Sequence, residues 1–198
     1  MASILVVCTG NVCRSPLGEG FVRRALADRL GVDAPEVSSA GTAGWEGSGA
    51  TPESVQSGAE RGLDVGGHRA RRLTDVMIEG ADLLVTMAGE HRDEVAAAMP
   101  AVAARTFTLK ELVRLLEALE PLEGPSAAIT QRVRDADTLR HAGSVGNPLD
   151  EDVVDPLGKP LDTYRAIAWE IEQWSERLAE GLAGPVPAAV PPLGKEGS

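Results

Sequence analysis

The segment that most constrains the fold is a short loop between Cys8 and Pro16, which reads Cys-Thr-Gly-Asn-Val-Cys-Arg-Ser-Pro. It follows an apolar run, residues 4–7, that is typical of a buried strand. Ser15 and Pro16 offer a capping hydroxyl and the proline favoured at the start of a helix. A strand, a tight loop and a helix N-terminus in this order turn backbone N–H groups toward one point. The segment therefore predicts a site for a phosphate dianion.

The loop also carries reactive side chains at both ends. Its N–H groups, the helix dipole and Arg14 should stabilise a thiolate at Cys8, which could attack a bound phosphoryl group. The Arg14 fork can bind two phosphoryl oxygens, and Ser15 can donate a hydrogen bond to the sulfur. The alternative is a buried structural cysteine before an ordinary capped helix. The residues expected to surround the phosphate are Thr9, Gly10, Asn11, Val12, Cys13 and Arg14.

Composition narrows the class of protein without identifying it. The 198 residues suit one domain, expected over 1–182, followed by a disordered tail over 183–198 that is rich in Pro, Ala and Gly. Nineteen Lys and Arg against 30 Asp and Glu argue against nucleic acid or an anionic membrane as the main partner. No long apolar segment is present, and Met1-Ala2-Ser3 lacks the basic start of a signal peptide. Two cysteines cannot build a disulfide scaffold, and a thiolate nucleophile needs a reducing compartment, so a cytoplasmic location is expected.

Strand and helix patterns alternate along the chain and predict an α/β fold. The expected architecture has three layers: a four-stranded parallel sheet of flavodoxin-like order 2-1-3-4, with helices on both faces. This order places Cys8 at the switch point where such sheets bind ligands. In the last helix, the residues expected on one apolar stripe are Leu161, Tyr164, Ala168, Ile171, Trp174 and Leu178. Trp169 and Trp174 are both expected in the core. The expected strands cover 3–8, 36–40, 82–87 and 105–108, and the expected helices cover 16–30, 51–62, 89–98, 109–120, 126–141 and 160–181.

Residues 7–16 match the signature V-C-x-G-N-x-C-R-S-P without a gap, and the chain resembles the low-molecular-weight protein tyrosine phosphatase family. The resemblance spans most of residues 1–182, with one long interruption. It implies a metal-independent phosphatase that needs no cofactor and passes through a phosphocysteine at Cys8. Its partners would be a phosphorylated protein or peptide substrate and the product, inorganic phosphate. Further landmarks are Ser39-Ala40-Gly41-Thr42, residues 59–64, His68-Arg69-Ala70-Arg71 and residues 81–87.

A general acid is needed to protonate the leaving oxygen as the P–O bond breaks. Asp155 is the candidate because Asp-Pro-Leu-Gly forms a turn just before the last helix, where the resemblance also implies the acid. Its carboxylate could then activate the water that releases phosphate. Asp150 and Asp152 lie close by, and Asp155 alternatively only starts a turn.

Other side chains carry weaker signals. Cys13 could lie near enough to Cys8 for a reversible, protective disulfide, as the resemblance also implies, or could simply pack beneath the loop. His68, His91 and His141 lack metal-ligand spacing, so structural or solvated roles are expected and no metal site is predicted.

Substrate preference rests on three positions around the expected pocket. Val12 occupies a position where the resemblance implies threonine in protein arginine phosphatases and an apolar residue in tyrosine phosphatases. An apolar rim favours an aromatic ring over a guanidinium. The resemblance places Trp45 at the rim, although a loop tryptophan can also be only a packing anchor, and Leu157 stands where an aromatic residue is usual. We therefore expect phosphotyrosine, rather than phosphoarginine, to be the preferred substrate.

Two other functions are known for loops of this kind, and one segment of the chain has no assigned role. Arsenate reductases reuse this loop but need further cysteines, and a non-catalytic phosphopeptide-binding module would have lost the nucleophile, arginine or acid. A helical insertion at about 112–150 could roof the site, dock a partner or fill surface.

Overall fold

A computed structural model describes residues 2–143 and 150–187 and confirms the expected fold. The parallel strands are β1 (Ser3–Cys8), β2 (Glu36–Gly41), β3 (Leu83–Thr86) and β4 (Thr106–Thr108), in the order β2-β1-β3-β4. Cys8 pairs with Gly41 in β2, and the preceding Val7 pairs with Thr86 in β3. The carboxyl end of β1 therefore lies between two neighbouring strands, where an α/β sheet binds its ligands.

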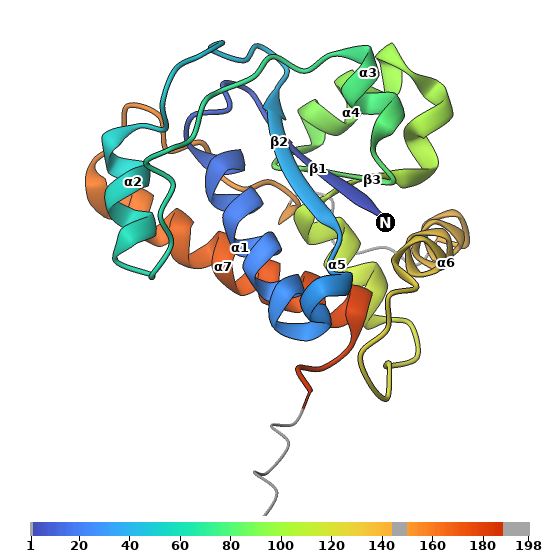
Figure 1. Ribbon diagram of the computed structural model, residues 1–198. Helices are drawn as coiled ribbons and strands as arrows, with labels where there is room; N and C mark the ends of the chain where they lie inside the picture. The colour runs from blue at the N-terminus through green and yellow to red at the C-terminus, as the bar shows by residue number, and fades with distance from the viewer. Residues whose placement is uncertain (1, 144–149, 188–198) are drawn as a thin grey trace, which may run out of the picture.

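Alternate residues of β1 point to two separate apolar cores. Ile4, Val6 and Cys8 join the core beneath α1 (Arg14–Leu30) and α7 (Leu161–Ala183), whereas Leu5 and Val7 join the other. Figure 1 shows α1 and α7 on one face of the sheet and α3 and α4 on the opposite face. This period of two, with both faces covered, explains why the strand is a continuous apolar run. The remaining helices are α2 (Pro52–Ala59), α3 (Asp75–Gly80), α4 (Gly89–Ala98), α5 (Leu109–Glu117) and α6 (Ile129–His141), and short 3-10 segments cover Gly31–Asp33 and Pro100–Arg105.

The sequence predicted most elements and misplaced some boundaries. The helix expected over 51–62 is shorter, and Thr51 caps it by accepting a hydrogen bond from the Ser54 N–H. The helix expected over 109–120 ends at Glu117, and the six-residue α3, which has a weak apolar period, was missed. Trp169 was wrongly expected in the core: it is 55% exposed, because it follows Ala168 by one helical step of about 100° and so leaves the apolar stripe. Trp174 is partly buried against the main core.

The start of the expected tail is held by the body of the protein. Ala183 is buried at the end of α7, and the Gly184 carbonyl accepts a hydrogen bond of 3.0 Å from Arg29 Nε. The ordered domain thus extends past the predicted boundary at residue 182. Residues 188–198 of the predicted tail, and residues 144–149 of the predicted insertion, lie outside the described part of the chain.

The helical insertion packs against the end of the sheet through Arg140 on α6. Its guanidinium lies over the Phe107 ring, 4.1 Å from the centroid, and donates hydrogen bonds to the carbonyls of Thr106 and Ala103. Ile129, Val133 and Ala136 of the same helix are buried in the main core. Helix α6 of the insertion is therefore packed into the domain.

Candidate active site

The loop after β1 holds the Cys8 sulfur against Ser15. Cys8 Sγ and Ser15 Oγ are 3.0 Å apart, and both residues are buried. Ser15 Oγ also accepts a hydrogen bond of 2.8 Å from the Asn11 amide, which leaves the hydroxyl proton free to point at the sulfur. Ser15 was expected to cap the following helix, and this is wrong. Helix α1 begins at Arg14, so Ser15 lies inside its first turn, where its hydroxyl contacts the sulfur. Cys13 is the N-cap residue, and no side chain caps the helix.

Asn11 fixes the shape of the loop. Its φ of +56° is uncommon for a residue with a side chain, and several hydrogen bonds hold it in place. The side-chain amide donates to Ser39 Oγ (2.9 Å) as well as to Ser15, and Oδ1 accepts from the Arg71 N–H (2.8 Å). His68 Nε2 donates to the Asn11 carbonyl (2.8 Å). The segments around Ser39 and His68, noted in the sequence as landmarks, therefore serve as the outer support of the loop.

Arg14 has its guanidinium beside the pocket and almost no exposed surface. Its side chain is 4% exposed, with Nη1 donating to the Val153 carbonyl (3.1 Å). Nη2 donates to Thr9 Oγ1 (3.2 Å) and to Asp155 Oδ2 (2.6 Å). Arg14 Nε is buried without a partner among the described residues. The guanidinium is thus oriented by the loop on one side and by the segment that carries Asp155 on the other.

Asp155 alone of the three neighbouring aspartates reaches the pocket. Its side chain is 44% exposed, and its second oxygen, Oδ1, accepts a hydrogen bond of 3.0 Å from the Leu157 N–H. Asp152 instead accepts from the Gly89 N–H at the start of α4 (2.7 Å), and Asp150 lies 3.5 Å from Lys110 Nζ. The geometry therefore separates the candidate acid from the two alternatives that the sequence left open.

The pocket above Cys8 is small and has apolar walls. Its volume is about 60 Å³. Val12 is buried in one wall, and Trp45 and Leu157 stand at the rim with 49% and 43% of their surface exposed. The full lining consists of Cys8, Thr9, Gly10, Val12, Cys13, Arg14, Trp45, Asp155 and Leu157. All residues that the sequence singled out for chemistry or substrate shape, apart from the internally bonded Asn11 and Ser15, line this one cavity.

Cys13 is buried, and its sulfur contacts residues outside the loop. Its sulfur lies 3.7 Å from Thr51 Oγ1 and 3.8 Å from the Tyr164 hydroxyl, and both cysteines are free thiols. Burial raises the pKa of the Cys13 thiol, and burial together with the Cys13 contact raises the pKa of Tyr164 to about 12. Packing beneath the loop, one of the two expected roles, is thus observed. The disulfide with Cys8 stays a prediction.

A structural or solvated role was expected for His91, and the structure shows the structural one, with the side chain buried against the loop. It is 1% exposed, and its Nε2 is 2.9 Å from Thr9 Oγ1, the same oxygen that accepts from Arg14. Burial, and then the nearby positive charge of Arg14, lower the pKa of His91 to about 4. A neutral imidazole therefore supports Thr9 at neutral pH. Only its spacing after β3 could have hinted at this position.

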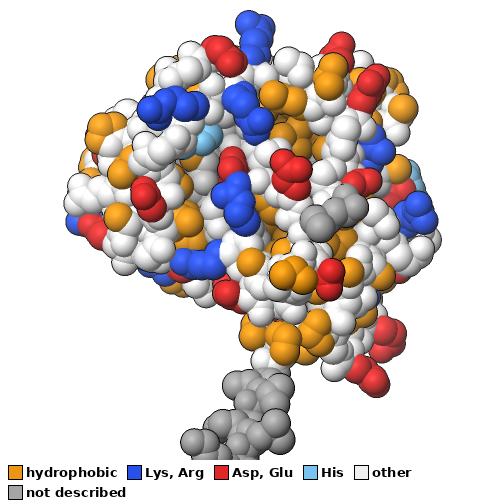
Figure 2. All heavy atoms as spheres, in the orientation of Figure 1, with side chains coloured by type: hydrophobic (Ala, Val, Ile, Leu, Met, Phe, Trp, Pro, Cys, Tyr) orange, Lys and Arg blue, Asp and Glu red, His pale blue; other side chains and the backbone are white. Residues whose placement is uncertain are grey.

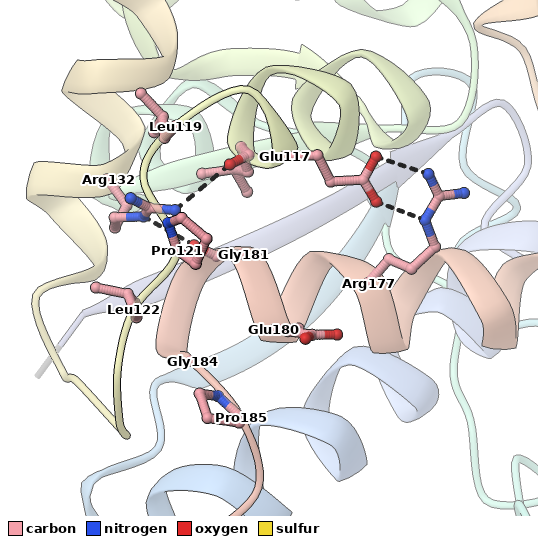
Figure 3. A pocket seen from close by; sticks show the side chains of 11 residues that line it. Glu117, Leu119, Pro121, Leu122, Arg132, Arg177, Glu180, Gly181, Gly184 and Pro185 are labelled. Carbon is pink, nitrogen blue, oxygen red and sulfur yellow. Dashed lines mark hydrogen bonds and ion pairs between the residues drawn. The ribbon is translucent and has the colours of Figure 1, made fainter.

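A second, larger cavity of about 290 Å³ lies away from Cys8, between α5, α6 and α7 (Figure 3). Its charged side chains are largely paired: Arg177 binds both carboxylate oxygens of Glu117, and Arg132 donates to the carbonyls of Leu116, Glu120 and Gly181. Neither cysteine nor histidine is among the residues that line it. We therefore place the candidate active site at Cys8.

Comparison with known proteins agrees with this site. Residues 3–142 match the model of the family described as low molecular weight phosphotyrosine protein phosphatase. The chain belongs to this family. It is a cysteine-based phosphatase.

Relatives of two named activities are similar to the chain. The probable low molecular weight protein-tyrosine-phosphatase EpsP of Ralstonia solanacearum is 39% identical over 110 residues, 56% of this chain and 72% of the relative. A protein-arginine-phosphatase of Geobacillus stearothermophilus is 31% identical over 179 residues, 90% of this chain and 95% of the relative. The solved low molecular weight protein tyrosine phosphatase from T. tengcongensis is 33% identical, with a TM-score of 0.68 over 92% of this chain and 100% of that one.

The rest of the described surface adds few constraints. Acidic and basic side chains are interspersed on the face shown in Figure 2. Across residues 2–143 and 150–187, none of the helices combines the length and apolar character required to cross a bilayer. Within the same residues, no three His, Cys, Asp or Glu side chains gather closely enough to hold a metal ion.

Proposed function

We propose that this phosphatase hydrolyses phosphotyrosine in proteins, with Cys8 as nucleophile, Arg14 as the phosphoryl-binding cation and Asp155 as general acid and base. The observation that carries the substrate preference is the apolar wall made by Val12, Trp45 and Leu157 around the thiol. An aromatic ring would lose contact with water against these side chains, whereas a guanidinium would lose hydrogen bonds that they cannot replace.

In the first step the Cys8 thiolate attacks phosphorus in line with the leaving oxygen. The Sγ–P bond forms as the P–O bond breaks, and protonated Asp155 gives its proton to the departing tyrosine oxygen. The 3.0 Å contact with Ser15 supports the anionic sulfur before attack and when it departs. Arg14 would exchange its bond to Asp155 for the equatorial phosphoryl oxygens, where its planar fork matches the developing charge.

In the second step the phosphocysteine is hydrolysed. The Asp155 carboxylate, left by the first step, removes a proton from water as the water oxygen attacks phosphorus. The Sγ–P bond breaks, phosphate leaves, and Cys8 is again a thiolate while Asp155 is again protonated. The partial exposure of Asp155 supports this role, because the attacking water must reach it from solvent.

The proposal is tested by comparing matched phosphotyrosine and phosphoarginine peptides without added metal. We expect a higher kcat/KM for phosphotyrosine, and no turnover of either peptide by Cys8→Ser at unchanged melting temperature. Val12→Thr should shift the ratio toward phosphoarginine, because it places a hydroxyl in the pocket wall. Faster hydrolysis of phosphoarginine by the unaltered protein would favour the arginine phosphatase alternative, which relatives aligned over 90% of this chain also represent.

We also infer that the protein acts in the cytoplasm on soluble phosphoproteins. The inference rests on the chemistry of Cys8, because a thiolate nucleophile is kept active by a reducing environment. Cell fractionation with an antibody to the protein checks it, and recovery from an oxidising compartment would contradict it.

A further inference from the structure

The segment that leads to Asp155 is held at three consecutive residues. Glu151 binds arginines of α4 and α5, Asp152 accepts from the Gly89 N–H, and the Val153 N–H donates to the Met87 carbonyl (2.7 Å). The Val153 carbonyl then accepts from Arg14. Backbone position is thus set just before the candidate acid, whereas the acid itself is half exposed.

Glu151 is the unusual member of this set because its carboxylate is buried. The side chain is 7% exposed, and its two oxygens have different partners: Oε1 accepts from Arg114 Nη2 (2.7 Å) and Oε2 from Arg92 Nη1 (3.2 Å). Burial, and then the neighbouring Glu111 charge, raise the pKa of Glu151, while the two arginines oppose that shift. Because two arginines hold this buried carboxylate from different sides, both the position and the orientation of the Glu151 side chain are fixed.

The contacts of Glu151 continue into the helical insertion. Arg92 Nη1 also lies 3.2 Å from Glu111 on α5, and Glu111 lies 3.7 Å from Arg140 on α6. Glu111 is held in turn by the capping box of α5, in which it accepts from the Thr108 N–H. These partly buried ion pairs therefore connect α4, α5 and α6 to the segment that carries Asp155.

From this geometry we propose that Glu151 is a positioning residue for the general acid: it locks the segment 151–155 onto α4 and α5, so that Asp155 meets the leaving oxygen. The proposal rests on the proposed role of Asp155. A displacement of about 1 Å in a catalytic group is enough to lower the rate of a proton transfer substantially. The neighbouring anchors at Asp152 and Val153 hold the middle of the segment, and Glu151 holds the end that joins the insertion.

The test uses two aryl phosphates that differ in their need for an acid. Phenyl phosphate releases a phenolate about as basic as that of tyrosine, with a pKa of about 10, whereas the 4-nitrophenolate leaves with little protonation. For Glu151→Gln we expect kcat/KM to fall about 10-fold on phenyl phosphate and less than about 3-fold on 4-nitrophenyl phosphate. The matched control is Glu117→Gln. Glu117 also lies on α5, and its exposed pair of hydrogen bonds joins it to Arg177 on α7, so its loss should change neither kcat/KM value.

A double variant separates positioning from general destabilisation. If Glu151 acts through Asp155, then Glu151→Gln in an Asp155→Asn background should lower kcat/KM by less than about 2-fold. Equal losses on both substrates, or losses that multiply in the double variant, would overturn the proposal. If Asp155→Asn itself shows no dependence on the leaving group, the acid assignment fails first and Glu151 has nothing to position.

A milder variant keeps the test available if Glu151→Gln does not fold. Arg114→Gln removes only the Oε1 partner, and its side chain is 23% exposed, so the protein should tolerate it. The same selective loss on phenyl phosphate is expected, at about 3-fold or more. An unchanged ratio between the two substrates in this folded variant would also overturn the proposal.

Discussion

His91 makes the stability of the protein depend on acid pH in a way that can be calculated. Its pKa is about 4 in the folded protein, against 6.5 for an ordinary histidine, because burial and Arg14 disfavour the imidazolium. The unfolded chain therefore binds a proton more readily than the folded protein between these values. The stabilisation due to this neutral histidine is fully present above pH 6.5 and is lost as the pH falls toward 4.

The size of the loss follows from the two pKa values. Linkage gives about 2 kcal/mol lost between pH 7 and pH 5, and about 3 kcal/mol by pH 4. Glu94, Asp152 and Asp155 favour the imidazolium, and their effect is already contained in the folded value, as is that of Arg14. Glu90 lies 3.5 Å from His91 Nε2 but is largely exposed and contributes weakly.

The assay is urea unfolding of the unaltered protein and His91→Gln at pH 7 and pH 5, followed by tryptophan fluorescence. The glutamine amide can still reach Thr9 but does not titrate, and the other titrating groups are common to both proteins. We expect the stability advantage of the unaltered protein to shrink by about 2 kcal/mol between the two pH values. A stability difference between the two proteins that is the same at pH 7 and pH 5 would refute the reasoning. So would an NMR titration in which all three histidines have pKa values near 6.5.

Two further substitutions test the loop itself. Arg14→Lys should lower kcat/KM at least about 100-fold in steady-state assays, because one ammonium cannot replace the bonds to Val153, Thr9 and the phosphoryl oxygens; a loss below 10-fold would contradict this. Gly41→Ala should cost about 1–3 kcal/mol in thermal unfolding and abolish activity, since its Cβ would lie 2.5 Å from the Thr9 carbonyl oxygen. Gly49→Ala is the control, with no atom within 4 Å, and equal effects of the two would rule out the close approach as the cause.

The sequence predicted the parts of the site that are local. Cys8 and Arg14 are joined by five intervening residues after a strand, so their geometry follows from one loop and one helix start. Asp155 was proposed as the acid because a turn precedes a long helix, where the resemblance also implies the acid. The fold class followed from the alternation of strands and helices, and the structure confirms its order.

Features that depend on distant contacts could not be predicted. His91 follows Thr9 by 82 positions, and only folding shows that the two meet. Glu151 has no distinguishing pattern in an acidic stretch, and its burial is decided by arginines of two other helices.

The position of Arg140 has a consequence for how copies of this chain meet. β4 is the last strand of the sheet, and an edge strand offers unpaired carbonyls to any extended segment that approaches it. Here the guanidinium on α6 covers the Phe107 ring and occupies the Thr106 carbonyl, so that edge is shielded by the chain itself. We therefore expect a chain without α6 to pair more readily with other copies along its β4 edge.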